Sequence, residues 1–236
     1  MICRLTANIN IVKKRYPIKK VFLFVAAFFC LMALCYKLFF IADHNAETLA
    51  IAENKAVTRL NPTEMAQLHE GDFILRKGFG YFSDIIAKNL NHGSIDVTHA
   101  GILVKRNSKW FVIHALSSDV SDIDGMQIQP LTDFLNYSAP GKIIITRAKN
   151  ADEATGKKIA QLAESYLAKH IPFDHKGVID DTSTLFCTEL IWVIIEKDLH
   201  ILTLPHETEI REKLFYSMEP MYNTDYFDIV INQYEK

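Results

Sequence analysis

The stretch Leu185–Leu190, with the sequence LFCTEL, places one cysteine where an apolar helix is predicted to begin. From Cys187 to Lys197, apolar residues recur at the spacing of one helix face. The polar residues 180–184 stand just upstream, as loop and N-cap residues do. A thiol in the first turn of a helix lies near free backbone N–H groups and the positive end of the helix dipole, and both stabilise a thiolate. Cys187 is therefore a candidate nucleophile, and the alternative is a small buried apolar residue.

The N-terminal part of the chain predicts a membrane anchor. Val21 to Tyr36 contains no charged residue, and Leu38 to Ala42 continues the apolar run beyond Lys37. Together they are long enough to cross a bilayer, with Lys37 able to extend toward the interface. The six basic residues before residue 21 predict a cytoplasmic N-terminus and export of the rest to the periplasm or the exterior. A cleaved signal peptide and a buried core helix are the alternatives.

We therefore divide the chain into a basic cytoplasmic segment (1–20), a transmembrane anchor or uncleaved signal (21–42), a stalk (43–61) and a globular domain (62–236). Residues 1–42 hold seven of the 26 basic residues and none of the 28 acidic ones, which leaves the remainder with a net charge of −9. Such an acidic domain is not expected to bind nucleic acid. Cys187 is its only cysteine, so a disulfide within the domain is excluded.

Strand and helix patterns are mixed without regular alternation in the globular domain, which predicts an α+β fold. The predicted strands are 71–76, 98–105, 109–116, 141–148 and 227–231, and the helices before Cys187 are 83–91 and 151–169.

Two histidines lie on the strands that flank Arg106 and Asn107. If these two residues form the turn, facing residues sum to 213, and His99 and His114 become direct cross-strand neighbours. A loop of odd length would place them on opposite faces. A neighbouring histidine can fix the tautomer of a catalytic base, so the pair is a candidate base and orienting group for Cys187. Alternatively both are hydrogen-bonded core residues, and the spacing alone does not bring Cys187 to His99.

With these residues in this order, the chain resembles the YiiX/YebB-like hydrolases, a circularly permuted branch of the NlpC-type, papain-like cysteine peptidase superfamily. The resemblance covers about Gly71 to Trp192. Its anchors are Gly71–Ile74, Thr98–Ile102, Trp110–Ala115, Pro172–Asp174, Asp180–Asp181 and Phe186–Leu190. It implies an antiparallel permuted papain-like sheet packed against a helix that bears the nucleophile.

The resemblance also implies roles for individual residues. His99 matches the histidine of the Ser/Thr-His-x-Gly pattern, the general base, and Cys187 the cysteine of Cys-Ser/Thr-Glu-Leu, the nucleophile. The orienting position falls on His114, where we expect glutamate in this branch. Asp174, like the two aspartates at 180–181, is expected to be structural or capping.

Three functions remain open at this point. The first is a thiol hydrolase that cleaves amide bonds, with cell-wall peptides among its substrates, through an acyl-enzyme on Cys187. The second is a lipid acyltransferase or esterase of the same fold, which the anchor and the aromatic residues Phe79, Tyr81 and Phe82 would suit. The third is a non-catalytic or zinc-binding module, with Cys187, His99 and His114 as ligands. No cofactor is expected, and the expected partners are a peptide or acyl-containing substrate and the membrane.

Overall fold

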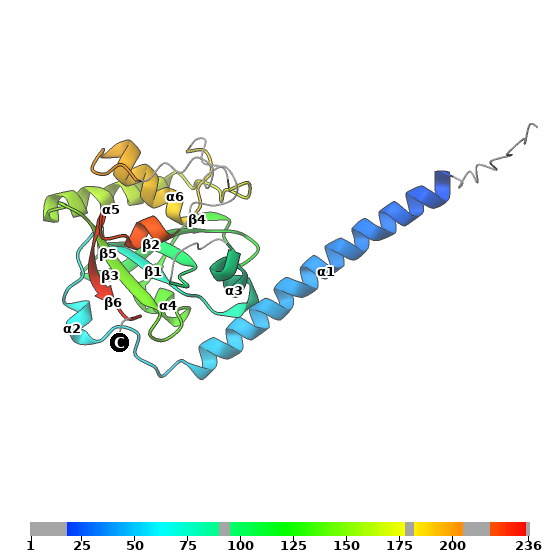
Figure 1. Ribbon diagram of the computed structural model, residues 1–236, viewed down its shortest axis with the longest axis horizontal. Helices are drawn as coiled ribbons and strands as arrows, with labels where there is room; N and C mark the ends of the chain where they lie inside the picture. Colours follow the sequence, from blue (N-terminus) through cyan, green and yellow to red (C-terminus); the bar gives the residue numbers. More distant parts are fainter. Residues whose placement is uncertain (1–17, 90–94, 178–181, 205–217, 235–236) are drawn as a thin grey trace, which may run out of the picture. The chain divides into compact units, whose positions relative to one another are not determined.

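The computed structural model describes residues 18–89, 95–177, 182–204 and 218–234 (Figure 1). Two compact units are distinguished, one ending at Ile41 and one beginning at Ala42. The predicted loop residues Asp180 and Asp181 lie outside the described ranges.

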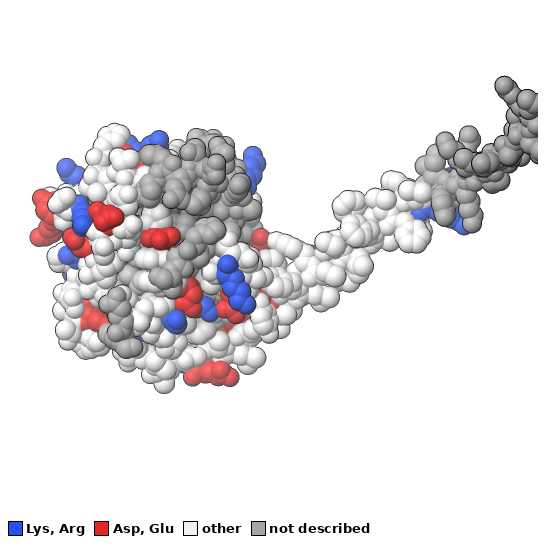
Figure 2. Space-filling view, viewed as in Figure 1, with Lys and Arg blue, Asp and Glu red and all other residues white. Residues whose placement is uncertain are grey.

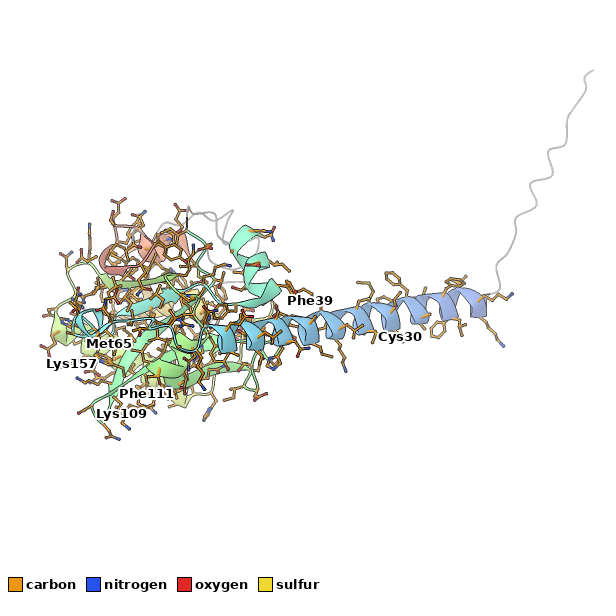
Figure 3. All side chains as sticks on the ribbon, turned by 90° about the horizontal axis from the view of Figure 1, so that it is seen from below. Cys30, Phe39, Met65, Lys109, Phe111 and Lys157 are labelled. Atoms are coloured by element: carbon orange, nitrogen blue, oxygen red, sulfur yellow. The ribbon has the colours of Figure 1, made fainter. Side chains whose placement is uncertain are left out.

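A single long helix, α1 (Ile18–Glu53), contains the predicted anchor. By length and composition it is able to cross a membrane. Its side chains are largely exposed in the first unit, including Cys30, which Figure 3 labels. Most of its surface carries no charge, whereas acidic and basic side chains are interspersed on the visible face of the second unit (Figure 2). The segment predicted as a stalk is helical as far as Glu53.

The second unit contains a six-stranded sheet in the order β4-β3-β2-β1-β5-β6, with every neighbouring pair antiparallel. The strands are β1 (Phe73–Arg76), β2 (His99–Arg106), β3 (Lys109–Leu116), β4 (Gly125–Pro130), β5 (Ile143–Ala148) and β6 (Phe227–Asn232). All five predicted strands are present. The sequence did not predict β4, because polar residues interrupt the apolar ones in this edge strand and the strand ends in proline.

The register of β2 and β3 differs from the predicted one. The turn is formed by Asn107 and Ser108, with φ of 49° and 62°, and Arg106 pairs with Lys109. A two-residue hairpin turn favours positive φ at both central positions, which asparagine tolerates better than arginine. Facing residues therefore sum to 215, and the predicted direct pairing of the two histidines is wrong. The shift of two residues is even, so both remain on one face of the sheet.

Helices cover both faces of the sheet (Figure 1). One face packs against α5 (Glu153–Ala168), α6 (Cys187–Trp192) and a continuing π-helix (Val193–Asp198). The other packs against α4 (Leu131–Asn136) and residues in and around α2 (Pro62–Met65). The remaining helices are α3 (Gly80–Asn89) and a 3₁₀ turn, Glu219–Tyr222. The mixed fold and the antiparallel sheet are thus confirmed.

The Gly71-Asp72 turn fixes the start of β1. Gly71 has a φ of +82°, and a Cβ there would lie 2.3 Å from the carbonyl oxygen of Gly156 in α5. The fully buried Asp72 accepts hydrogen bonds of 2.7 and 2.9 Å from Arg147 on β5. This contact ties β1 to its neighbours and so fixes Arg76, at the other end of the strand.

Candidate active site

Cys187 is the first residue of α6, as predicted. The apolar face behind it is buried, since Leu190, Ile191, Ile194 and Ile195 are all 0% exposed. Phe186 precedes it in an extended conformation, and its N–H donates to the carboxylate of Glu189. Glu189 therefore acts as a helix-start carboxylate. The half-buried thiol lies against backbone N–H groups of Ala100 and Thr188.

The two histidines meet through their ring nitrogens. Nε2 of His99 lies 2.9 Å from Nδ1 of His114, and the ring of Phe134 packs against both imidazoles. If His99 donates this hydrogen bond, its Nδ1 is the ring nitrogen left to accept a proton. His114 then carries its own proton on Nε2, a buried atom with no hydrogen-bond partner among the described residues.

Cys187 and His99 line one cavity of about 250 Å³. Aromatic side chains contribute to its wall: Phe79, Phe82, Phe173 and Phe186. Four charged residues also line it, namely Arg76, Asp43, Glu47 and Asp119.

The electrostatics of the site favour neutral groups. Burial raises the pKa of Cys187 to about 11, against the opposing effects of the backbone N–H groups and of Arg76. Burial lowers the pKa of His99 well below its usual value, and the neighbouring His114 and Arg76 lower it further. Burial and Arg76 together lower the pKa of His114 to about 3. These shifts favour a thiol and neutral imidazoles in the free protein over a thiolate–imidazolium pair.

Sequence reasoning missed Arg76. It is the last residue of β1, pairs directly with His99 in the sheet and is 6% exposed. Its guanidinium lies 4.8 Å from the centroid of the Phe134 ring, and Nη1 donates to the carbonyl of Tyr137. The one signal for Arg76 in the sequence was its place as a cationic residue at the end of an otherwise apolar strand, Phe-Ile-Leu-Arg.

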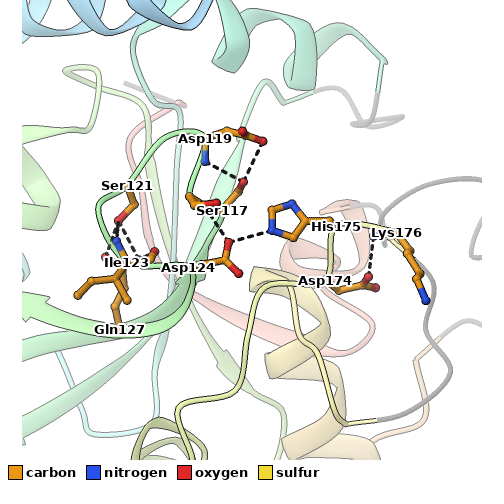
Figure 4. A network of polar contacts seen from close by, with 10 residues as sticks. Ser117, Asp119, Ser121, Ile123, Asp124, Gln127, Asp174, His175 and Lys176 are labelled. Carbon is orange, nitrogen blue, oxygen red and sulfur yellow. Dashed lines mark hydrogen bonds and ion pairs between the residues drawn. The ribbon is translucent and has the colours of Figure 1, made fainter. Parts of the chain in front are cut away.

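A polar network joins two loops beside the cavity (Figure 4). His175 lies 2.8 Å from Asp124, which also accepts from the backbone N–H of Ser118. Asp174 is 2% exposed and accepts from the N–H of Lys176. The buried carboxylate of Asp174 therefore stabilises its own loop, in agreement with the structural role that we expected for it.

A cysteine at the start of a helix, packed on an antiparallel sheet that carries the preceding histidine, defines the permuted papain-like class. Residues 67–225 match a family described as "Permuted papain-like amidase enzyme, YaeF/YiiX, C92 family". The chain belongs to this family, and the resemblance drawn from its motifs is confirmed.

Individual relatives agree with this assignment. The chain is 28% identical over 105 residues to the uncharacterized protein YiiX of Escherichia coli strain K12, a match that covers 44% of this chain and 47% of that protein. The match thus spans about half the length of this curated relative. A crystal structure of the metalloprotein yiiX from Escherichia coli O157:H7 has a TM-score of 0.56 and 20% identity, over 70% of this chain and 98% of that one. At this identity, the comparison shows the fold.

The zinc hypothesis can be tested against the geometry. In the part of the chain that the structure describes, no three His, Cys, Asp or Glu side chains come together as a metal site. Nε2 of His99 and Nδ1 of His114 face each other and are occupied by their mutual hydrogen bond. The arrangement of the two rings therefore does not fit a zinc site that uses these nitrogens.

Proposed function

We propose that this protein is a thiol hydrolase of amide bonds, with Cys187 as nucleophile, His99 as general base and His114 as the group that orients His99. The observation that carries the proposal is that Cys187 and His99 line the same cavity while Nε2 of His99 is bonded to His114. Membership of a family of amidases supports the amide as the bond cleaved. Cell-wall peptides are one substrate class that suits an exported domain.

The chemistry begins from neutral groups. Nδ1 of His99 takes the thiol proton as the sulfur attacks the carbonyl carbon, and the carbonyl oxygen becomes an oxyanion. The backbone N–H of Cys187, at the start of α6, is a candidate donor to that oxyanion. Collapse breaks the C–N bond, and the amine leaves with the proton held by His99. Water then attacks the thioester and gives a proton to His99. The C–S bond breaks, His99 returns that proton to the sulfur, and the acid is released.

Two substitutions test the proposal. Cys187→Ala and His99→Ala are expected to abolish hydrolysis of an amide substrate found by screening peptides, including cell-wall fragments. The matched controls are Cys35→Ala, in the first unit, and His200→Ala, at an exposed histidine. Circular dichroism and thermal unfolding check that each variant folds. Activity that persists in folded Cys187→Ala or His99→Ala would refute the assignment.

A second candidate keeps the thioester but takes a lipid acyl group, as an acyltransferase or esterase. The observation that favours it is the aromatic lining of the cavity, to which Phe79 and Phe82 contribute. Peptide amides and lipid esters assayed side by side distinguish the two functions, because each predicts turnover of one set only.

We also propose that residues 21–42 anchor the protein, with a cytoplasmic N-terminus and an exported hydrolase domain. The length and apolar composition of α1 and the preceding basic residues support this orientation. Protease added to intact cells with a permeable outer layer should degrade the domain after residue 62. Protection that ends only on lysis of the inner membrane would contradict the orientation.

A further inference from the structure

The cavity contains a buried cation without a counter-ion in contact. Arg76 lines it, is 6% exposed and makes no ion pair among the described residues. Its Nε, also buried, has no hydrogen-bond partner among them. Burial lowers the pKa of Arg76 only to about 10, so the guanidinium stays charged near neutral pH. Nη1 donates to the carbonyl of Tyr137, but a buried charge without a counter-ion in contact is costly, which points to an anion that is bound during function.

The position of Arg76 places this charge beside the reacting groups. Arg76 and His99 are direct partners in the β1–β2 register, and direct partners share a face of the sheet. Phe134 lies against the guanidinium and against both histidine rings. Cys187 lines the same cavity and interacts electrostatically with Arg76. An anion bound to Arg76 would therefore lie next to the bond that Cys187 attacks.

Three acidic residues line the cavity and oppose the binding of an anion there. Asp119 accepts a hydrogen bond of 3.1 Å from the hydroxyl of Ser117. Asp43 is already engaged, because it accepts the N–H of Phe82 at 2.9 Å. Glu47 lines the cavity and interacts with Arg76 through space, without an ion pair among the described residues. Its negative charge should repel an incoming anion, so removing that charge provides a test in the opposite direction to removing Arg76.

We propose that Arg76 binds an anionic group of the substrate, of the size of a carboxylate, next to the scissile amide, and that Glu47 weakens this binding. The substrate class is thus an acyl amide that carries a free carboxylate close to the bond cleaved. The inference rests on the proposed function in taking Cys187 as the reacting thiol and an amide as the bond cleaved.

Alkylation of Cys187 tests the proposal without knowledge of the natural substrate. The full chain, in a non-ionic detergent, is treated at one pH with iodoacetate or with iodoacetamide, and the peptide containing Cys187 is quantified by mass spectrometry. The readout is the ratio of the two rates, in which the thiolate fraction cancels. N-acetylcysteine provides the reference ratio for a free thiol. We expect the ratio at Cys187 to exceed that reference by about tenfold or more, because an opposite charge nearby favours the anionic reagent.

Three variants test whether the ratio of the two rates changes as the proposal requires. Arg76→Gln should reduce the ratio to that of the free thiol, Arg76→Lys should keep part of it, and Glu47→Gln should increase it. The control is Arg106→Gln, which removes the same charge from an exposed residue paired with Glu164 and should leave the ratio unchanged.

The possible failures are distinguishable. A reactive Cys187 with the ratio of a free thiol would overturn the anion site and leave the nucleophile in place. A Cys187 inert to both reagents even at pH 10 in folded protein would overturn the proposed function together with the anion site. If Arg76→Gln does not fold, Glu47→Gln still decides, since an unchanged ratio there contradicts the proposal.

Discussion

Nε2 of His99 lies 2.9 Å from Nδ1 of His114, although the two residues are not direct partners in the sheet. Continued by one pair beyond Ile102 and Ile113, the register places Gly101 opposite His114. A Cβ on Gly101 would lie 2.4 Å from Cγ1 of Val112 and 3.3 Å from Cβ of His114, so the absence of a side chain at Gly101 leaves room for both. The imidazole of His114 reaches diagonally along the sheet to His99.

This hydrogen bond predicts a difference between two substitutions of similar size. His114→Gln keeps an acceptor for the Nε2–H of His99, whereas His114→Leu removes it. We expect His114→Leu to lower kcat by about 10²-fold or more, because the base loses its oriented tautomer, and His114→Gln to lose clearly less. The measurement is kcat and KM for both variants on an amide substrate. Equal losses in two folded variants would argue that position 114 only fills space.

The neutral thiol predicts how alkylation of Cys187 depends on pH. With a pKa raised to about 11, the thiolate fraction should still be rising at pH 10, above the free-cysteine value of about 8.5. The rate of alkylation by iodoacetamide, followed at the Cys187 peptide, should therefore reach no plateau between pH 4 and pH 10. A plateau below pH 8 would instead indicate a resting thiolate stabilised by His99.

The features that were predictable from the sequence depend on local periodicity. The apolar face of the helix after Cys187 follows from its spacing, as does the division of β2 and β3 into two faces. Leu103 and Val112 lie in one core, and Ile102 and Ile113 in the other. Burial selects apolar side chains at these positions, so the pattern is visible without the fold.

The features that were missed depend on backbone angles or distant contacts. The turn lies at residues 107–108 and not at the predicted 106–107. Both pairs are polar, so only the φ values distinguish them. Arg76 reaches the site through its register with His99, 23 positions further along the chain, and no local pattern encodes that pairing. The cavity itself is assembled from several loops and helices, including the residues after the anchor.

The buried histidines predict a loss of stability in acid. Their folded-state pKa values lie below the unfolded value of about 6.5, so below that pH the unfolded chain takes up protons that the folded one does not. The contribution of these histidines to the free energy of unfolding is fully present above pH 6.5. For His114, this contribution decreases as the pH falls to about 3. Each histidine should contribute a slope of about 1 kcal/mol per pH unit in the free energy of unfolding.

Urea unfolding of the full chain from pH 7 to pH 4 measures this slope, and both tryptophans, Trp110 and Trp192, report on the second unit. His114→Gln should flatten the dependence, and the control His200→Gln, at an exposed histidine, should not. A slope unchanged by His114→Gln would show that this side chain is protonated in the folded protein.

Two glycines with similar positive φ are predicted to differ in the free-energy cost of replacement by alanine. Gly71 and Gly141 have φ of +82° and +69°, so alanine is strained at either position by about 1 kcal/mol or more. At Gly141 nothing lies within 4 Å of the added Cβ, whereas at Gly71 it would overlap the backbone of Gly156, 2.3 Å away. The atoms that the Cβ would meet belong to the backbone of α5 and not to a flexible side chain, so the turn before β1 and α5 have to separate. Gly71→Ala should therefore cost about 3 kcal/mol more than Gly141→Ala in urea unfolding.

Gly71→Ala should also reduce the reactivity of Cys187, because β1 carries Arg76 to the site. If the two substitutions destabilise the protein equally, the contact between the Gly71 turn and α5 adjusts without loss of stability. The turn at Gly71 then does not position the site.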